Sequence, residues 1–251
     1  MQGFSLVELS IVLVILGLLT GGILSGQSLI RAAEIRSVST EFQRYSAAIY
    51  TFRDKYFALP GDFTKATDFW GAADADQATC ETTPSAGTET CNGNGDGQIL
   101  GIAPNFSEPY RVWQHLANAG LIEGQYTGAN ATLSGGASAY VAGINMPASK
   151  MPNGFWLITW QSASSGSLTN FAYSAGHMLR FTGNVLTSEE CWNVDTKLDD
   201  GKPATGIMMA FKGSAAIPLT TRANQPAGPA DLAAEYNFAF TGKNCNPMMY
   251  F

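Results

Sequence analysis

Few residues of this chain are charged, and no stretch of it is strongly basic. Lys, Arg, Asp and Glu make up 14% of the 251 residues, and their balance is a net charge of -6. Proteins that bind nucleic acid through bulk electrostatics carry a basic patch or stripe, so nucleic acid is not an expected partner. The scarcity of charge, together with 27 glycines, favours a loop-rich extracytoplasmic β domain over a cytosolic enzyme.

The short motifs of the common enzyme classes are also absent. The sequence contains no HExxH, no GxSxG and no P-loop, and its two histidines, His115 and His177, are far apart. We therefore expect no catalytic residues and no enzymatic activity, and we interpret His115 as a packing or surface residue. The same reasoning assigns four large aromatic residues to the core rather than to sugar-binding platforms: Trp113, Trp156, Trp160 and Trp192.

The four cysteines do not form a CxxC motif, which argues against a zinc ribbon or a thioredoxin-like site. They are spaced as two pairs, Cys80 with Cys91 and Cys191 with Cys245. Three disulfide connectivities are possible for four cysteines, and proximity in the sequence favours these two pairs. Disulfides persist in oxidising compartments, so the pairs agree with an extracytoplasmic domain.

One long apolar run opens the chain, and Glu8 is the only charged residue between Phe4 and Ile30. The run is long enough to cross a bilayer, which needs roughly 20 apolar residues. It lacks the basic start, short core and following cleavage site of a secretory signal peptide, although a simple membrane anchor remains an alternative. A carboxylate in an apolar helix costs a few kcal/mol, so Glu8 needs a partner. A free α-amino group of a neighbouring subunit, created by cleavage after Gly3, would supply one.

A helical stripe continues beyond the apolar run. Seven apolar residues recur at spacings of three and four, and Glu41 is among the charged residues that lie off this stripe. We predict one helix from Phe4 to about Phe57, roughly 80 Å long at 1.5 Å per residue, ended by Leu59-Pro60-Gly61. The stripe consists of Ile35, Val38, Phe42, Tyr45, Ile49, Phe52 and Tyr56.

The remaining sequence predicts two short helices and four strands, with two of the strands between the helices and two after the second helix. One helix lies between a capping Ser107 and Gly120, and Ser188 is expected to cap a second helix that extends to Leu198. The candidate strands are 154-160, 170-182, 206-212 and 235-240. This order predicts an α+β fold in which the striped half of the long helix packs on an antiparallel sheet.

Calcium is the only cofactor that the sequence suggests, and two loops are candidates for it. In the first, Asn92, Asn94 and Asp96 alternate as in half of an EF-hand loop, but the ends of the pattern are Asn92 and Ala103 instead of Asp and Glu. An ordinary Asn-Gly and Asp-Gly turn is the alternative. The second groups three carboxylates, Asp195, Asp199 and Asp200, before a glycine turn, and its alternative is a solvated loop at a helix end.

The segment "GFSLVELSIVLVILGLL" resembles the prepilin-type cleavage and methylation signal of type IV pilins and pseudopilins. This resemblance implies that a prepilin peptidase cuts between Gly3 and Phe4 and methylates the new amine of Phe4. It also implies that Glu8 neutralises the amine of a neighbouring subunit. The expected organisation is a leader remnant (1-3), a transmembrane and filament-core helix (4-30), the amphipathic half of the same helix (31-57) and a globular head (58-251).

The resemblance extends over about 60 residues, since "FRDKYFALPGD" is similar to the exit of the pilin helix into its globular domain. The Cys191–Cys245 link is similar to the C-terminal disulfide loop of many pilins, and some pseudopilins hold calcium in a comparable late loop. The sequence departs from the pattern in two ways. "MQG" carries no basic residue, while Arg31 and Arg36 follow the span. Many relatives have a helix-breaking proline in the middle of the span, where this chain has Gly17, Gly21, Gly22 and Gly26, which would allow either close helix packing or local melting on assembly.

The resemblance predicts a structural subunit of a homo-oligomeric type IV pilus-like filament. Its expected partners are prepilin peptidase, the inner-membrane assembly machinery and, before assembly, membrane lipid. The subunit would reside in the bacterial inner membrane and then in an extracellular or periplasmic filament. A pseudopilin of a type II secretion system is one alternative, and a membrane-anchored, calcium-dependent adhesin is an alternative of another class.

Overall fold

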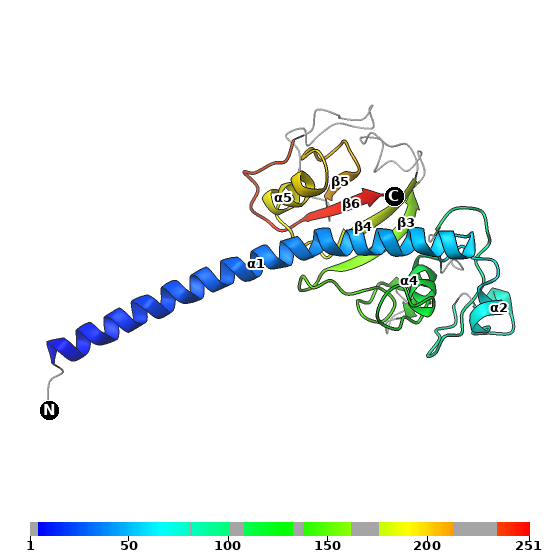
Figure 1. Ribbon diagram of the computed structural model, residues 1–251, viewed down its shortest axis with the longest axis horizontal. Helices are drawn as coiled ribbons and strands as arrows, with labels where there is room; N and C mark the ends of the chain where they lie inside the picture. Colours follow the sequence, from blue (N-terminus) through cyan, green and yellow to red (C-terminus); the bar gives the residue numbers. More distant parts are fainter. Residues whose placement is uncertain (1–4, 81, 101–107, 133–137, 162–175, 213–234) are drawn as a thin grey trace.

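One helix, α1 (Leu6–Tyr56), runs along the head of the molecule and then projects far beyond it (Figure 1). The computed structural model describes the chain except for residues 1–4, 81, 101–107, 133–137, 162–175 and 213–234. The predicted helix is therefore confirmed over its described length. It ends where Phe57 adopts the left-handed conformation (φ 53°) and donates its backbone N–H to the carbonyl of Arg53, just before Pro60.

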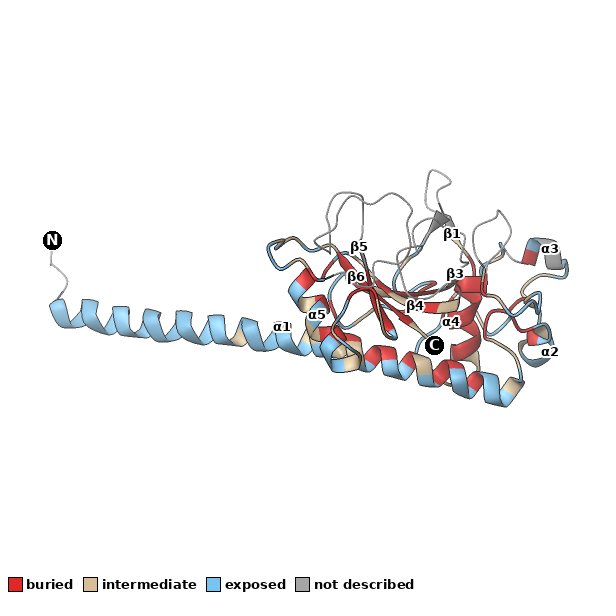
Figure 2. Ribbon diagram, turned by 90° about the horizontal axis from the view of Figure 1, so that it is seen from above, coloured by how far each residue is buried: buried red, intermediate tan, exposed pale blue. Residues whose placement is uncertain are grey.

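The two halves of α1 have opposite environments (Figure 2). Every large apolar side chain from Leu6 to Ile30 is at least half exposed. In the second half, the predicted stripe faces the head: Ile35 and Tyr56 are partly buried at its ends, and the five residues between them are buried, namely Val38, Phe42, Tyr45, Ile49 and Phe52. The change falls where the sequence passes from an all-round apolar helix to one with a single apolar face.

Glu41 corrects the predicted stripe, because its side chain is only 4% exposed although the pattern placed it outside. Its carboxylate accepts the indole N–H of Trp156 (Oε2 to Nε1, 2.7 Å) and the backbone N–H of Lys150 (2.8 Å). A buried carboxylate is tolerated when donors satisfy it. The donors come from a segment more than a hundred residues away, so helical periodicity could not reveal them.

Four antiparallel strands form the main sheet, in the spatial order β3-β4-β6-β5. Helix α1 contacts β4, and the two longer helices of the head contact β3, β5 and β6. Within the core, Tyr45 lies edge-on to both Trp113 and Trp156. The α+β layout predicted from the sequence is thus observed. The strands are β3 (Phe155–Gln161), β4 (Gly176–Thr182), β5 (Met208–Lys212) and β6 (Cys245–Tyr250).

The last strand is not the one that the sequence predicted. Residues 235-240 form irregular chain and a turn, and the sheet is instead completed by β6. Pro247 made β6 an unfavoured candidate. It lies opposite Ala210 of β5 and just beyond the segment Met248–Tyr250 that pairs with β4, which places the proline at the end of that ladder. The first part of the predicted strand 170-182 lies outside the described residues.

The two longer head helices are α4 (Glu108–Asn118) and α5 (Ser188–Leu198). The expected cap of α4, Ser107, lies outside the described residues. The cap of α5 is Thr187 rather than Ser188, because Thr187 and Glu190 exchange hydrogen bonds in a capping box.

Smaller elements complete the head. They are α2 (Ala66–Trp70), α3 (Gln77–Cys80) and the two-residue strands β1 (Ala131–Thr132) and β2 (Ser138–Ala139). Both expected disulfides are present, Cys80–Cys91 and Cys191–Cys245. The first closes a loop beside α4, and the second joins α5 to β6, so each fixes a loop-rich part of the head.

Candidate functional site

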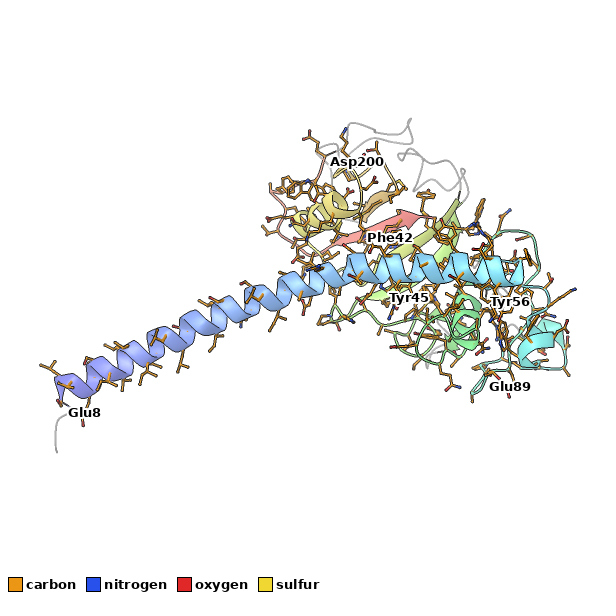
Figure 3. All side chains as sticks on the ribbon, in the orientation of Figure 1. Glu8, Phe42, Tyr45, Tyr56, Glu89 and Asp200 are labelled. Carbon is orange, nitrogen blue, oxygen red and sulfur yellow. A yellow bond between two sulfur atoms is a disulfide. The ribbon has the colours of Figure 1, made fainter. Side chains whose placement is uncertain are left out.

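The free end of α1 carries Glu8, far from the head (Figure 3). Ser5 is the N-cap: its hydroxyl accepts the N–H of Val7 (3.3 Å), and its own N–H donates to Glu8 Oε2 (2.9 Å). This is a capping box, and its negative charge lies at the favourable end of the helix dipole. Glu8 thus has a backbone hydrogen-bond partner within its own segment, in addition to the charged partner expected from a neighbouring subunit. The S-x-x-E spacing could have revealed the backbone partner.

Gly3 and Phe4, the residues of the expected cleavage and methylation, lie outside the described residues. Among the described residues, Glu8 Oε1 has no hydrogen bond, so one carboxylate oxygen remains available for a cation from another molecule. A local N–H therefore satisfies only part of the hydrogen-bonding capacity of this carboxylate.

The projecting half of α1 is chemically suited to an apolar environment. Its hydroxyl groups donate to carbonyls of the same helix, as Ser10 does to Val7, Thr20 to Leu16 and Ser28 to Ser25, at 2.8 to 2.9 Å. Polar groups satisfied in this way need no water. By length and composition this helix can cross a membrane.

Four glycines on this half leave open space around the helix. A side chain at any of them would meet nothing within 4 Å. They form two pairs with the small-xxx-small spacing that lets apolar helices approach closely. The pairs are Gly17 with Gly21 and Gly22 with Gly26.

The neck, which we define as Gln27–Glu34 of α1 with the head loops around it, is held by an ion pair. Arg31 donates from Nε and Nη2 to the two oxygens of Glu190, at 2.6 and 2.7 Å. Nη2 also donates to the carbonyl of Val185, and Nη1 donates to Glu34 at 3.0 Å. Burial would raise the pKa of Glu190, but the hydrogen bonds from Arg31 and Thr187 outweigh it and lower that pKa. The head is thereby fixed to the helix just after the apolar run.

Beside this ion pair, the neck contains an open groove of about 600 Å³. Its floor is made of two turns with left-handed asparagines, Asn153 (φ 64°) and Asn184 (φ 54°). Asn184 is fixed by an exchange of hydrogen bonds with Asn246. The residues around the groove include Gln27, Ile30, Asn153, Asn184, Val185 and Lys243.

The histidine interpreted as a packing residue is indeed buried. His115 Nδ1 accepts the N–H of Gly61 (3.0 Å), so Nε2 carries the ring proton and donates to Thr90 Oγ1 (3.0 Å). Burial, with the charge of Arg111, lowers the pKa of His115 to about 3. This histidine joins the exit of α1 to the first disulfide loop and is not accessible as a general base.

The tryptophans divide into two groups. Trp113 and Trp156 are fully buried, as expected of core residues. Trp160 is partly exposed and packs against His177, and Trp192 is 38% exposed and packs edge-on against Phe238. The assignment of Trp192 to the core is therefore wrong, because only one face of α5 packs on the sheet.

The side chains of the first calcium candidate take part in hydrogen bonds within the protein. Asn92 Oδ1 accepts the backbone N–H of Thr67, and the side-chain amide of Asn94 donates to Asp96 Oδ2 at 3.1 Å. Carboxylates from elsewhere hold the loop through its backbone N–H groups: Asp62 binds those of Gly95 and Gly97, and Glu108 binds those of Asn94 and Leu100. Burial raises the pKa of Glu108 to about 7.

The second candidate does come together. One oxygen each of Asp195, Asp199 and Asp200 lies within 4.8 Å of the others, on the side of the head labelled by Asp200 in Figure 3. Each carboxylate already accepts protein donors, from Tyr236, Met208 and Thr205 respectively. Burial, together with the neighbouring carboxylates, raises the pKa of Asp195 to about 7 against the hydrogen bonds from Tyr236 and Gly201, which lower it. The donor set suits a hard cation, and calcium stays a prediction.

The site that stands out is thus the apolar half of α1, with a carboxylate at its free end and a rigid neck at the other. This arrangement can insert into a lipid bilayer or pack against further copies of the same helix. Comparison with family models, curated proteins and solved structures found no match for the chain.

Proposed function

We propose that this chain is a structural subunit of a type IV pilus-like filament, held in the bacterial inner membrane before assembly. The observation that carries this proposal is the exposure of every large apolar side chain from Leu6 to Ile30 on a helix that a folded head presents. An apolar surface of this extent marks a binding interface or a membrane segment. A filament core made of such helices would bury it after the subunit leaves the membrane.

Glu8 supports a role in assembly beyond anchoring. In the single chain it accepts one hydrogen bond from Ser5, and its Oε1 is left without a partner among the described residues. The amine of Phe4 in a neighbouring subunit would complete the pairing of this carboxylate. Removing one partner of a buried charge pair typically costs 3–5 kcal/mol, so the pair would favour correct register between subunits.

The proposal includes maturation of the chain. Prepilin peptidase would cut between Gly3 and Phe4 and methylate the new amine, and the inner-membrane machinery would then extract the subunit. Close approach of helices in the filament core is supported by the open surface at the two glycine pairs. In a filament, the neck would fix the orientation of each head relative to its helix, because Arg31 bonds Glu34 of the helix and both Glu190 and the Val185 carbonyl of the head.

The experiment compares Glu8→Gln and Glu8→Ala with a matched control, Asp54→Asn, which changes an exposed carboxylate at the head end of the same helix. The ratio of sheared filament to membrane-resident protein is measured by immunoblot. We expect both Glu8 variants to be processed and folded but to lose filament, and the control to assemble normally. A wild-type ratio for both Glu8 variants would refute the pairing mechanism. An unprocessed N-terminus in the intact mass of filaments would refute maturation.

Two other functions make different predictions. A pseudopilin of a type II secretion system would depend on Glu8 in the same way but would form a periplasmic filament linked to protein secretion. A membrane-anchored, calcium-dependent adhesin is favoured by one observation, the convergence of Asp195, Asp199 and Asp200. It would remain monomeric in the membrane and would tolerate the loss of Glu8.

A further inference from the structure

The second half of α1 has one side that faces away from the sheet and is exposed along the head (Figure 2). We define this polar face by the exposed side chains of α1 from residue 36 to residue 55, a length of about 28 Å at 1.5 Å per residue. It carries four basic residues and one acidic residue, so its net charge is +3. These residues are Arg36, Arg44, Arg53 and Lys55 against Asp54.

The positive charge of the polar face is not used within the molecule. Both ion pairs among the described residues belong to Arg31 of the neck, which lies outside this face. Arg44 lies over the ring of Tyr45 at 4.8 Å, a contact that positions a cation without neutralising it. From the head, the carboxylate of Glu123 borders the face, since it and Arg44 both interact electrostatically with Tyr126. With this carboxylate included, the face is still positive.

Negative charge is concentrated where α1 ends. Tyr56 packs edge-on against Phe69 of α2, and residues 62–98, which we call the acidic lobe, extend past the head end of the helix (Figure 1). The disulfide between Cys80 and Cys91 closes this lobe, and Figure 3 shows Glu89 on it. The exposed charges among its described residues are four carboxylates and one lysine, a net charge of -3. These residues are Asp68, Asp76, Glu89 and Asp96 against Lys65.

One chain cannot bring the two surfaces together. The acidic lobe lies past the end of α1, whereas the polar face runs back from that end along the side away from the sheet (Figures 1 and 2). A second, parallel copy shifted toward the head end along the helix axis would lay its polar face beside the acidic lobe of the first. Such a contact joins two different surfaces and repeats in one direction, which is how heterologous interfaces build open filaments.

We propose that the polar face of α1 in one copy docks on the acidic lobe of a second copy of this chain. The inference rests on the proposed function, in which bundled apolar helices keep the copies parallel. Opposite potentials then select both the partner and the axial register, because like-charged surfaces repel each other.

A membrane surface fits the polar face less well than a second copy does. Arg53 lies 23 residues beyond Ile30, which is about 35 Å along the helix. The attraction of a basic residue to anionic headgroups falls off within a Debye length, about 10 Å at 0.1 M salt. Only the start of the face could therefore respond to lipid, whereas the acidic lobe of a second copy can reach the part nearest the head end.

The test uses the full chain in non-ionic detergent, which removes the membrane surface. A photoreactive p-benzoylphenylalanine in place of Thr51, an exposed residue of the polar face, should join two copies. The cross-linked peptide of the second copy should come from residues 62–98. Higher salt should reduce the yield of dimer, because the contact is made by exposed charges.

Charge reversal then identifies the two surfaces. Arg36→Glu with Arg53→Glu should lower the yield of cross-linked dimer about ten-fold, the order of effect expected when two exposed ion pairs become repulsive. Asp68→Lys with Glu89→Lys should lower it to a similar extent. The chain with all four substitutions should recover the dimer, because each reversed face then meets a reversed lobe.

The matched control is Lys197→Glu with Lys202→Glu, which changes the net charge as much as the arginine reversals do but at exposed positions elsewhere on the head. It should leave the dimer unchanged. Cross-linked peptides from outside the acidic lobe, a wild-type yield in either pair of reversals, or no recovery in the combined variant would overturn the docking.

The shear assay with Glu8→Gln tests the proposed function separately. Wild-type chain that forms filaments but fails the charge reversals refutes only the docking of the polar face on the acidic lobe. Chain that passes the charge reversals in detergent but never forms filaments refutes only the proposed filament.

Discussion

The Glu41 carboxylate accepts the indole N–H of Trp156 at 2.7 Å and thereby joins α1 to β3 across the centre of the head. Its second oxygen accepts the backbone N–H of Lys150. The indole N–H would otherwise be buried without this acceptor, since Trp156 is fully buried. This side chain therefore contributes to the docking of the long helix alongside the apolar residues around it.

The first prediction concerns this contact. Glu41→Leu removes an acceptor from two donors, so we expect a loss of about 2–3 kcal/mol in the free energy of unfolding, because unsatisfied buried groups bear their full desolvation cost. Glu41→Gln keeps one acceptor and should lose less. Urea unfolding followed by tryptophan fluorescence measures both variants. Gln43→Leu on the exposed face of the same helix is the control, and an equal loss in the control would contradict the role of Glu41.

The second prediction is a pH dependence at Glu108, which is 5% exposed and whose pKa burial raises from 4.5 to about 7. A raised pKa means that its stabilising contribution is complete below pH 4.5 and is lost as pH rises through 7. His115 acts in the opposite sense, because its pKa is lowered from 6.5 to about 3 and stability is lost as pH falls below 6.5. The two effects oppose each other between pH 4.5 and 6.5.

Glu108→Gln removes only the first of these effects. The stability of the wild type relative to this variant should therefore fall as pH rises from 4.5 to 7, by at most about 1.4 kcal/mol per pH unit. Thermal or urea unfolding at half-unit pH steps measures the difference, with Glu123→Gln at an exposed position as the control. A difference that is constant with pH would show that Glu108 is not perturbed by burial.

The third prediction separates folding from assembly on the apolar helix. Gly21→Leu replaces a poor helix former by a good one, and its side chain meets nothing in the single chain. We expect unchanged membrane insertion and an unchanged head, but fewer filaments, because the leucine blocks the close approach of a neighbouring helix. The shear assay measures the outcome. Leu13→Ile, which alters the same helix without filling a glycine position, should assemble normally, and normal filaments from Gly21→Leu would exclude close packing there.

The fourth prediction tests calcium. If the late acidic loop binds it, saturating calcium raises the melting temperature of the full chain and a chelator lowers it, since a ligand of the native state adds about 2.7 kcal/mol at one hundred times its Kd. We expect Asp199→Ala with Asp200→Ala to abolish this shift and Asp96→Ala to preserve it, because the late carboxylates are the three that converge among the residues that the structure describes. Loss of the shift in Asp96→Ala alone would assign calcium to the earlier loop. No shift in the wild type would exclude both loops.

Local pattern was sufficient to predict several elements of this protein. Periodicity and composition, which are properties of neighbouring residues, predicted the long helix, β3 and α5. They also predicted that α1 changes at the end of the apolar run from an all-round apolar helix to one with a single apolar face. The disulfide pairs agree with proximity in the sequence. The Ser5–Glu8 capping box is equally local, since its two residues lie three positions apart.

Other features depended on contacts between distant segments. β6 contains Pro247 and has little strand character, and it forms because β4 and β5 offer partners on both sides. Glu41 became buried because Trp156 and Lys150 supply donors from β3 and its approach. The neck ion pair joins Arg31 of α1 to Glu190 of α5. Glu190 lies in the first turn of α5, where its capping box with Thr187 holds it beside the neck.

The sequence by itself thus determined an apolar helix with one carboxylate near its start, since hydropathy and helical period are properties of consecutive residues. Only the tertiary structure decided which charges are satisfied and which remain free. Arg31, Glu41 and Glu108 are single charged residues in the sequence, yet their environments differ. Arg31 pairs with Glu190 and Glu41 accepts from Trp156, both far along the chain, whereas Glu108 accepts from backbone N–H groups of the preceding loop. One oxygen of Glu8 accepts no hydrogen bond within the described residues. Burial and pairing energies depend on distances in space, so no local pattern could have separated these groups.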